Sequence, residues 1–458
     1  MGTGLARRAA MSPVPTKLPP LFSSVVRPIQ DFFRREAASG ILLLLAAAIA
    51  LIWANSPASG LYLSLFDHPL LLGSGDTVAR FTVRELINDG LMTVFFFVVG
   101  MEIKREMVVG ELRTLSRALL PLIAALGGMV VPAAIYVALN RGGPGLAGWA
   151  IPMATDIAFC IGCLTLLKGR VPHALVVFLT ALAIFDDMGG ILVIAFFYGS
   201  GLHVSWLVGA LVLTLGLFAL NRLNVGNGLV YAAGGVALWY SLHHGGIHAT
   251  LSGVVLGLMI PARAEKPVRE VLAELHAHTE GLVRTPPDED LDNAQLLAIE
   301  EKLEDLEPPL NRFVHLLHPL VAFFIMPVFA LANSGVSLAG MGLADLAQPI
   351  PLGAALGLFL GKQLGIFAFT LAAVRLGVSP MPGNASRVKL YGVSVVAGIG
   401  FTVALFIGGL AFPDPRLLDQ AKLGILLGSL LSGVMGFLLL RATRPMPVEG
   451  GSTSPTST

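Results

Sequence analysis

The strongest constraint on the fold of this chain is a series of apolar runs that approach the length of a bilayer crossing. Hydrophobic residues make up 55% of the 458 residues and charged residues only 13%, whereas a soluble domain carries about 25% charged residues. A helix needs about 20 apolar residues to cross roughly 30 Å of hydrocarbon. We therefore predict an all-α polytopic membrane protein with about 12 transmembrane helices, at residues 38–54, 86–103, 118–139, 148–167, 173–199, 203–220, 228–243, 246–260, 314–333, 351–374, 389–411 and 421–440.

Basic residues orient these spans, because cytoplasmic loops are enriched in Lys and Arg. A cytoplasmic N-terminus places most of the basic side chains on the cytoplasmic side. It leaves only five outside: Arg80, Arg84, Arg141, Arg416 and Lys422. An even number of spans then returns the C-terminus to the cytoplasm, so we expect both termini there.

The chain divides into one transmembrane domain, residues 31–441, and two cytoplasmic tails, residues 1–30 and 442–458. Residues 66–83 contain β-favouring side chains around a Gly-Ser-Gly turn, which predicts an extracytoplasmic β-hairpin or an ordinary loop. Residues 262–312 are acidic and have helical apolar spacing, which indicates a cytoplasmic insertion. The net charge of +1 gives no indication of a nucleic-acid partner.

Two adjacent carboxylates, Asp186 and Asp187, lie near the centre of the apolar run from Ala174 to Gly199. An ionisable side chain at bilayer depth costs about 2.5–3.5 kcal/mol even on lenient scales, so it generally lines a polar cavity or an ion path. Neighbouring residues on a helix differ by about 100° in direction, so the two carboxylates are expected to meet different partners. Their position indicates the movement of cations or protons.

Asp156 and Lys362 are expected at the same depth as Asp186. Each of the three lies 12 to 16 residues from a basic residue at the predicted cytoplasmic rim, which corresponds to about 18–24 Å of helix. Carboxylates in excess over one lysine favour a cation site. The alternative is a static ion pair that only holds helices together. Asp89 enters a span nearer the outer face and is compatible with either the ion path or a helix start.

Two segments near these residues are predicted to interrupt their helices. Pro152 precedes Thr155, and Gly398 and Gly400 precede Thr402. Unwound backbone within a membrane is tolerated where it lines a cavity. Its carbonyl groups, with the hydroxyl of Thr155, are the oxygen ligands that Na⁺ and Li⁺ favour. Cys160 and Cys163 have no second ligand pair nearby, so no zinc site and no cofactor are expected.

From about Asp31 to Arg441 the chain resembles the NhaA-type sodium/proton antiporter family. The resemblance rests on "INDGLMTVFFFVVGMEIKRE" (87–106), "WAIPMATDIAF" (149–159), "ALAIFDDMGG" (181–190), "GIHATLSGVVLG" (246–257), "GKQLGI" (361–366) and "GIGFTVALFI" (398–407). It implies inverted-topology repeats with two interrupted helices that cross at the membrane midplane. It also implies a bacterial inner membrane, a homodimer, and electrogenic exchange of Na⁺ or Li⁺ for protons.

The resemblance assigns roles to the buried residues. It makes Asp186 and Asp187 the cation- and proton-binding pair, with Asp156 and Thr155 facing them. It implies that Lys362 pairs with Asp186 when sodium is absent. It also implies that the helices are interrupted around Asp156 and at residues 398–402, and that Asp156 and Lys362 balance the dipoles of the half-helices there.

The resemblance further assigns a pH response to four residues, namely Glu102, Arg105, Glu106 and His248. We expect Glu102, Glu106 and His248 at a cytoplasmic funnel, although charges at a helix end are also commonly just solvated. This chain has Val314 before His315 where close relatives have an acidic residue, so its activation pH is expected to differ.

The sequence thus predicts a secondary transporter and no enzyme: a pH-dependent antiporter in which Na⁺ or Li⁺ and protons compete for Asp186 and Asp187. Two other functions use similar buried groups. A proton-coupled carrier of a small organic solute fits the same buried charges. An intramembrane aspartyl protease also needs two buried aspartates, but the segments "ATD" and "IFDDMGG" differ from the expected GxGD type.

Overall fold

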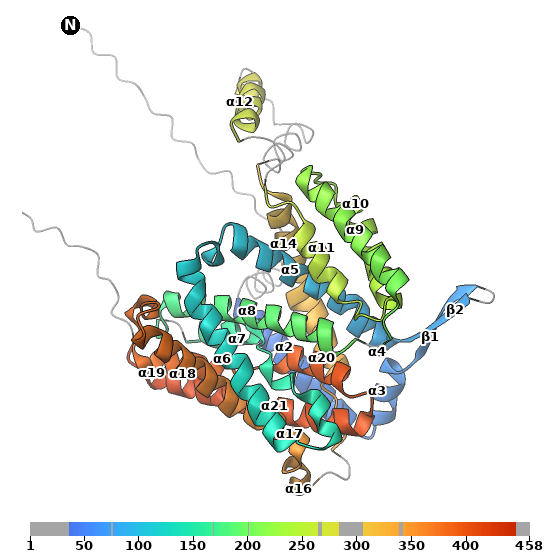
Figure 1. The fold of residues 1–458 in the computed structure, drawn as a ribbon, viewed down its shortest axis with the longest axis vertical. Coiled ribbons are helices and arrows are strands. Elements are labelled where there is room, and N and C mark those ends of the chain that lie inside the picture. The colour runs from blue at the N-terminus through green and yellow to red at the C-terminus, as the bar shows by residue number, and fades with distance from the viewer. Residues whose placement is uncertain are drawn as a thin grey trace, which may run out of the picture.

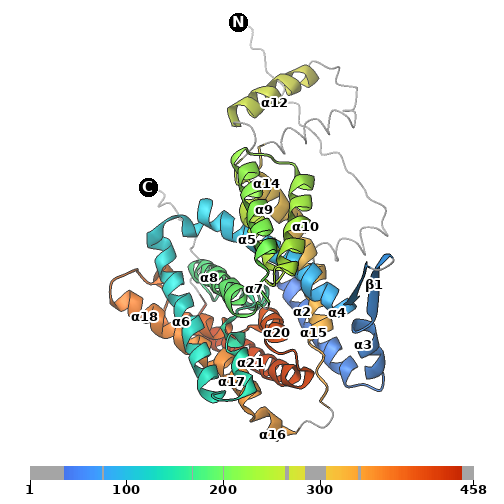
Figure 2. The ribbon, with the colours of Figure 1, turned by 45° about the vertical axis from the view of Figure 1, so that its right-hand side comes forward.

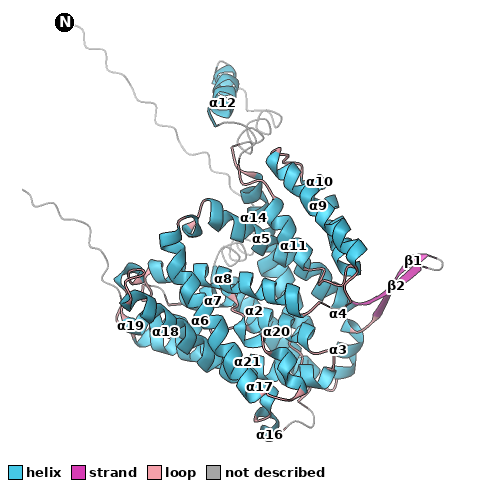
Figure 3. Cartoon of the chain, viewed as in Figure 1, coloured by secondary structure: helices cyan, strands magenta, loops and turns pink. Residues whose placement is uncertain are grey.

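The computed structural model describes residues 36–74, 77–167, 169–199, 201–263, 268–283, 306–338 and 342–445. The N-terminal tail, residues 284–305 of the acidic insertion and nearly all of the C-terminal tail lie outside these ranges. The part of the chain that is described is mainly helical (Figure 3). All twelve ranges predicted as spans contain helix.

Up to Met259 the chain contains α2 (Glu36–Ala54), α3 (Ser59–Phe66), α4 (Val83–Glu85), α5 (Met92–Val108), α6 (Leu115–Leu139), α7 (Ile157–Thr165), α8 (His173–Phe197), α9 (Val204–Arg222), α10 (Gly228–His244) and α11 (Leu251–Met259). The rest of the described chain contains α12 (Val268–Val283), α14 (Pro309–Leu320), α15 (Met326–Asn333), α16 (Leu343–Leu346), α17 (Pro349–Leu356), α18 (Lys362–Arg375), α19 (Arg387–Val396), α20 (Phe401–Ala411) and α21 (Pro415–Ala442). Short 3₁₀ or π segments join several of them: η1 (Leu86–Leu91), η2 (Glu111–Arg113), η3 (Pro144–Gly148), η4 (Ile151–Met153), η5 (Val321–Ile325), η6 (Gly357–Gly361) and η7 (Pro382–Asn384).

By length and apolar composition, seven of the described helices are candidate membrane spans, or up to ten if each of three bent helix pairs is one span. A multi-pass helical membrane protein is therefore confirmed, whereas the predicted count of 12 is not. The difference lies partly in α10 and α11, which have 17 and nine residues. Residues 245–250 form turns before α11, so the predicted span 246–260 is helical only in its later part.

The helices pack in two groups (Figures 1 and 2). In the first group, α5 packs on α11, α2 on α15, and α10 on both α9 and α11. In the second group, α6 packs on α8, α17 and α18, and α21 packs on α17, α19 and α20. The main contact between the groups joins α2 to α7. This arrangement leaves the two groups more closely packed within themselves than against each other.

Glycine allows the close approach of α5 and α11. A Cβ atom added at Gly253 would lie 2.2 Å from the carbonyl oxygen of Thr93, and one at Gly257 would lie 2.5 Å from that of Phe97. Such contacts between small residues are typical of helix packing in membranes. Because Gly253 meets Thr93 and Gly257 meets Phe97, α11 runs beside α5 in the same direction.

A two-stranded antiparallel sheet stands out from the helices (Figure 1). Strand β1 (Pro69–Ser74) pairs with β2 (Thr77–Thr82), with Pro69 opposite Thr82. The prediction of a hairpin within residues 66–83, rather than an ordinary loop, is thus confirmed. We call the end of the bundle formed by α3, β1, β2, α4 and the start of α21 the hairpin end. In the acidic insertion, α12 agrees with the helical apolar spacing, and residues 284–305 lie outside the described residues.

Candidate functional site

Two helix breaks meet inside the bundle. The segment Pro144–Met153 is bent by 43° from α7, and α19 is bent by 44° from α20. The breaks are hydrogen-bonded to each other, because the amide of Asp156 donates to the carbonyl oxygen of Ile399 (2.7 Å). The hydroxyl of Thr155 lies 3.1 Å from the carbonyl oxygen of Ala397. Backbone groups released by one break are therefore partly satisfied by the other.

Asp156 lies between the N-termini of α7 and α20. Its Oδ1 accepts a hydrogen bond from the amide of Phe159 (3.1 Å), in the first turn of α7. Its Oδ2 accepts from the amide (3.2 Å) and the hydroxyl (2.5 Å) of Thr402, in the first turn of α20. Helix N-termini carry partial positive charge and free amides. One buried carboxylate thus caps two helices, and both of its oxygens have donors.

Lys362 and Asp186 form a buried ion pair. The side chains of both residues are 0% exposed, and the ammonium of Lys362 donates to Oδ2 of Asp186. The hydroxyl of Thr155 donates to the same oxygen (2.8 Å). Oδ1 of Asp186 is buried and has no hydrogen-bond partner. Lys362 follows directly on the π-helical segment η6, and such bulges are frequent at functional sites.

Asp187 differs from its neighbour. It is 7% exposed, against 2% for Asp186, and no hydrogen bond or ion pair joins its carboxyl group to another described residue. Adjacent helical residues differ by about 100° in direction, and the ion pair with Lys362 is made by Asp186. The two aspartates therefore have separate surroundings, one paired and one without a partner.

The described residues contain no group of three or more His, Cys, Asp and Glu side chains arranged to hold a metal ion. A cation held by Asp186 and Asp187 would thus need neutral oxygens to complete its ligands. The hydroxyl of Thr155, which contacts Asp186, and the backbone carbonyls at the breaks are groups of this kind on the two interrupted helices. Gly400 keeps these backbones close, because an added Cβ there would lie 2.9 Å from the carbonyl oxygen of Ala154.

The residues expected at a cytoplasmic funnel are divided between the two ends of α5. Glu102, Arg105 and Glu106 lie together on its last turns, where Arg105 Nη2 is 3.9 Å from Glu106 Oε1. His248 lies in the turn before α11 and interacts electrostatically with Asp89, at the opposite end of α5. The expectation that His248 joins Glu102 was therefore wrong. The physical reason is that α11 runs in the same direction as α5, so the start of one meets the start of the other.

Val314, the position at which the resemblance implies an acidic residue, packs in the core at 3% exposure. The side chain of the adjacent His315 is 74% exposed, and its Nε2 lies 3.7 Å from Oε1 of Glu307. Val314 thus contributes an apolar contact to the core, and the adjacent His315 is exposed.

Three phenylalanine rings lie along α20 beyond the breaks and were not predicted. Phe406 packs on Phe96 of α5 (centroids 5.3 Å apart) and on Phe329 of α15 (6.4 Å). All three are buried. α20 starts beside Asp156 and is separated by only three residues from α21, so the rings lie between the carboxylates and the hairpin end. Phenylalanine is so common in this chain that the sequence carries no signal for this cluster.

An apolar helical bundle with two broken helices that meet at buried charges defines a multi-pass membrane protein with an ionic site of the kind found in secondary transporters. The model of the family Na⁺/H⁺ antiporter 1 matches residues 30–440. The chain belongs to this family.

Individual relatives are similar over nearly their full length. The chain is 65% identical to Na⁺/H⁺ antiporter NhaA 1 of Myxococcus xanthus, over 94% of this chain and 95% of that protein. It is 62% identical to Na⁺/H⁺ antiporter NhaA of Anaeromyxobacter, again over 94% and 95%. It is 47% identical to the protein of that name from Bordetella parapertussis, over 95% of this chain and all of the relative.

The geometry predicts the effect of removing the lysine. Lys362→Gln leaves Asp186 buried without its counter-charge, and breaking a buried ion pair in this way costs about 3–5 kcal/mol. We expect a lower melting temperature in detergent, with a smaller deficit at acidic pH, where Asp186 can take up a proton. The double variant Asp186→Asn, Lys362→Gln removes both charges and should recover much of the loss. Equal melting of Lys362→Gln and the unchanged protein would show that the pair does not stabilise the fold.

Proposed function

We propose that the chain exports Na⁺ or Li⁺ in exchange for protons by competition of the two ions for Asp186 and Asp187. The observation that carries this proposal is a buried aspartate pair at two helix breaks, in which one carboxylate is bound to Lys362 and the other has no partner. Membership in the Na⁺/H⁺ antiporter 1 family supports Na⁺ and H⁺ as the ions exchanged. No cofactor is needed, because the cations are cargo.

The contacts suggest an order of events. Asp187 provides the first oxygen ligand for an arriving cation, because it is the more exposed carboxylate and has no partner. To bind between both aspartates, the cation must displace the ammonium of Lys362 from Oδ2 of Asp186, while Oδ1 is already without a hydrogen bond. Protonation of the aspartates removes their charge and releases the cation. Asp156 remains fixed throughout, since the ends of α7 and α20 occupy both of its oxygens.

We further propose that the protein lies in the bacterial inner membrane with 12 spans and both termini in the cytoplasm. The distribution of Lys and Arg supports this orientation. The breaks at Asp156 and at 397–400 would then cross near the midplane and belong to inverted repeats. Exchange of more than one proton per Na⁺ would make transport electrogenic.

The proposal predicts that each aspartate of the pair is essential. Asp186→Asn or Asp187→Asn removes half of the negative charge at the site, so Na⁺-driven proton movement should fall to background. The measurement is the collapse of ΔpH in everted vesicles after addition of Na⁺, Li⁺, K⁺ or choline. Asp414→Asn, at an exposed helix cap, is the matched control and should retain exchange. Normal exchange rates in a correctly inserted Asp187→Asn protein contradict the assignment.

Competition predicts that transport rises from acid to alkaline pH. Acidification should raise the KM for Na⁺, by about tenfold per pH unit for each competing proton in the range where the carboxylates bind protons. The separation of the other titratable residues allows a sharper test: Glu102→Gln with Glu106→Gln, and His248→Ala alone. Both variants should keep the rise in KM. If only the unchanged protein shows it, the ends of α5 rather than the aspartates set the pH response.

We also propose a homodimer in which residues 66–83 make part of the interface. β1 and β2 stand out from the bundle (Figure 1), and an isolated two-stranded hairpin is marginally stable in water, so a second copy is a suitable partner. Deletion of residues 69–82 should shift the detergent-solubilised protein toward monomer and leave exchange intact, as measured by light scattering after gel filtration. A deletion variant that remains dimeric would place the interface elsewhere.

A further inference from the structure

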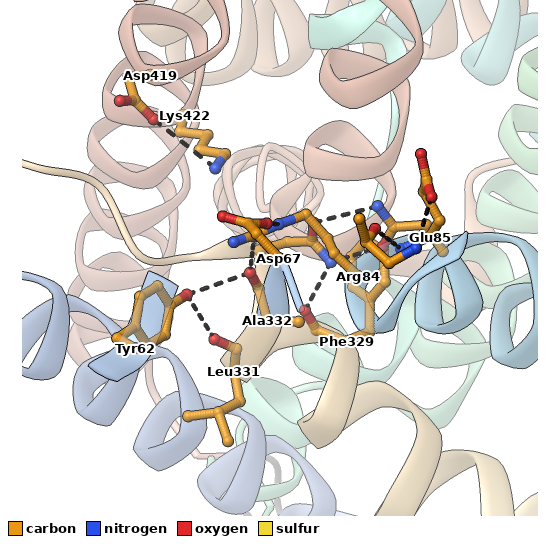
Figure 4. Close-up of polar contacts among 12 residues, drawn as sticks. Tyr62, Asp67, Arg84, Glu85, Phe329, Leu331, Ala332, Asp419 and Lys422 are labelled. Atoms are coloured by element: carbon orange, nitrogen blue, oxygen red, sulfur yellow. Dashed lines mark hydrogen bonds and ion pairs between the residues drawn. The ribbon is translucent and has the colours of Figure 1, made fainter. Parts of the chain in front are cut away.

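Charged side chains at the hairpin end are compensated locally. The ammonium of Lys422 lies 3.7 Å from Oδ1 of Asp419, one turn earlier on the same helix (Figure 4). Arg84 Nε donates to Oδ1 of Asp67 (2.9 Å). Both pairs therefore have partners that are independent of the aspartate site. A buried polar side chain that does connect to that site lies beside Lys362.

The side-chain amide of Gln363 joins the segment before Lys362 to a second helix. Gln363 is 3% exposed and is the second residue of α18. Its Nε2 donates to the carbonyl oxygen of Phe359 (2.7 Å), within η6. Its Oε1 accepts from the hydroxyl of Tyr391 (2.6 Å), on α19. The carbonyl oxygen of Phe359 can only accept, so the amide nitrogen faces η6 and the amide oxygen faces the hydroxyl.

The segment η6, which leads into Lys362, contacts both helix breaks. The amide of Lys362 donates to the carbonyl oxygen of Gly357, five residues earlier. An added Cβ at Gly357 would lie 2.6 Å from Cβ of Pro152, which precedes the first break. An added Cβ at Gly398, in the second break, would lie 2.5 Å from the carbonyl oxygen of Leu358. A shift of η6 would therefore disturb both breaks together with the base of the lysine.

Tyr391 joins α19 to α18 at two points. Its ring meets that of Phe367 edge-on, with the centroids 5.3 Å apart, and its hydroxyl donates to Gln363. A hydrogen bond needs a defined donor–acceptor geometry, whereas apolar contact is non-directional. The hydroxyl therefore adds to the packing a constraint on the rotation of α18 about its axis. That rotation sets the direction of Lys362, the first residue of α18.

We propose that Gln363 and Tyr391 are positioning residues for Lys362. Their hydrogen bonds hold η6 and the start of α18 in the orientation that directs the ammonium to Asp186. The inference rests on the proposed antiport, in which the ion pair with this lysine must break before Na⁺ binds between the aspartates. The two residues thus set how readily Na⁺ displaces the ammonium. They act through the lysine and are not ligands of the cation.

Tyr391→Phe tests the proposal, because it removes the hydroxyl and keeps the ring on Phe367. Na⁺ then meets a weaker competitor, so the KM for Na⁺ should fall by about fivefold, which corresponds to the net contribution of one hydrogen bond. The measurement is the collapse of ΔpH in everted vesicles over a series of Na⁺ concentrations. Gln363→Leu removes both contacts of the amide and should lower the KM at least as far. Adding Tyr391→Phe to Gln363→Leu should have no further effect.

Two buried hydroxyls on the same helices provide matched controls. Thr370 Oγ1 donates to the carbonyl oxygen of Ile366 (2.6 Å) within α18, and Ser394 Oγ donates to that of Leu390 (2.9 Å) within α19. Each hydroxyl bonds to its own helix, so Thr370→Val and Ser394→Ala should leave the KM for Na⁺ unchanged. A KM that is unchanged or raised in Tyr391→Phe, or that falls equally in the controls, overturns the proposal.

The melting temperature in detergent gives a test that does not depend on transport. Tyr391→Phe is compared in the unchanged protein and in the Asp186→Asn, Lys362→Gln protein, where no ion pair is left to be positioned. The loss of the hydroxyl should lower the melting temperature more in the first than in the second. Equal losses would show a purely structural contact and overturn the proposal. Absence of exchange in the unchanged protein contradicts the proposed antiport, whereas this comparison still decides the role of Tyr391.

Discussion

The hydrogen bonds of Asp156 are the constraint on which the rest of the site depends. Two broken helices place their amide ends in the same small volume, where free N–H groups and like dipole ends would otherwise be left together without water. A single carboxylate accepts from Phe159 on one helix and from Thr402 on the other. This contact keeps the breaks together, and it holds Thr155, the preceding residue, against Asp186.

The same constraint explains why the buried charges are not equivalent. Asp156 has donors on both oxygens and acts as a helix cap. Asp186 shares one oxygen between Lys362 and Thr155 and has the other free of hydrogen bonds. Asp187 has no partner among the described residues and is the most exposed of the three. The three carboxylates thus differ in the number of contacts that hold them, which falls from Asp156 through Asp186 to Asp187.

Much of this arrangement could be predicted from the sequence, for a physical reason. Apolar runs indicate bilayer crossings because the thickness of the hydrocarbon layer sets the length of a spanning helix. A charged side chain inside such a run is rare, so it marks a candidate functional site. The breaks followed from Pro152, Gly398 and Gly400. Contacts between residues far apart in the sequence could not be predicted in this way. The position of His248 depends on the direction in which α11 runs beside α5. The cluster of Phe96, Phe329 and Phe406 consists of a residue type that occurs throughout the chain. The distribution of basic residues predicts Lys422 outside the membrane, whereas the structure buries it within α21.

The distribution of paired and unpaired charges also limits where exchange can begin. Lys362 with Asp186 and Lys422 with Asp419 are each compensated locally, so an arriving cation gains nothing from either pair until a lysine moves. Asp156 can accept a cation only by giving up helix-capping bonds. Of these three carboxylates, Asp187 is the one that has no contact to a lysine or a helix end to give up when it binds a cation or a proton. Ion exchange that starts at Asp187 and proceeds to Asp186 therefore needs one contact to break, the ion pair between Lys362 and Asp186. The same oxygen of Asp186 also accepts from Thr155, which lies at a helix break. Displacement of the lysine by a cation is therefore coupled to the stability of the helix breaks.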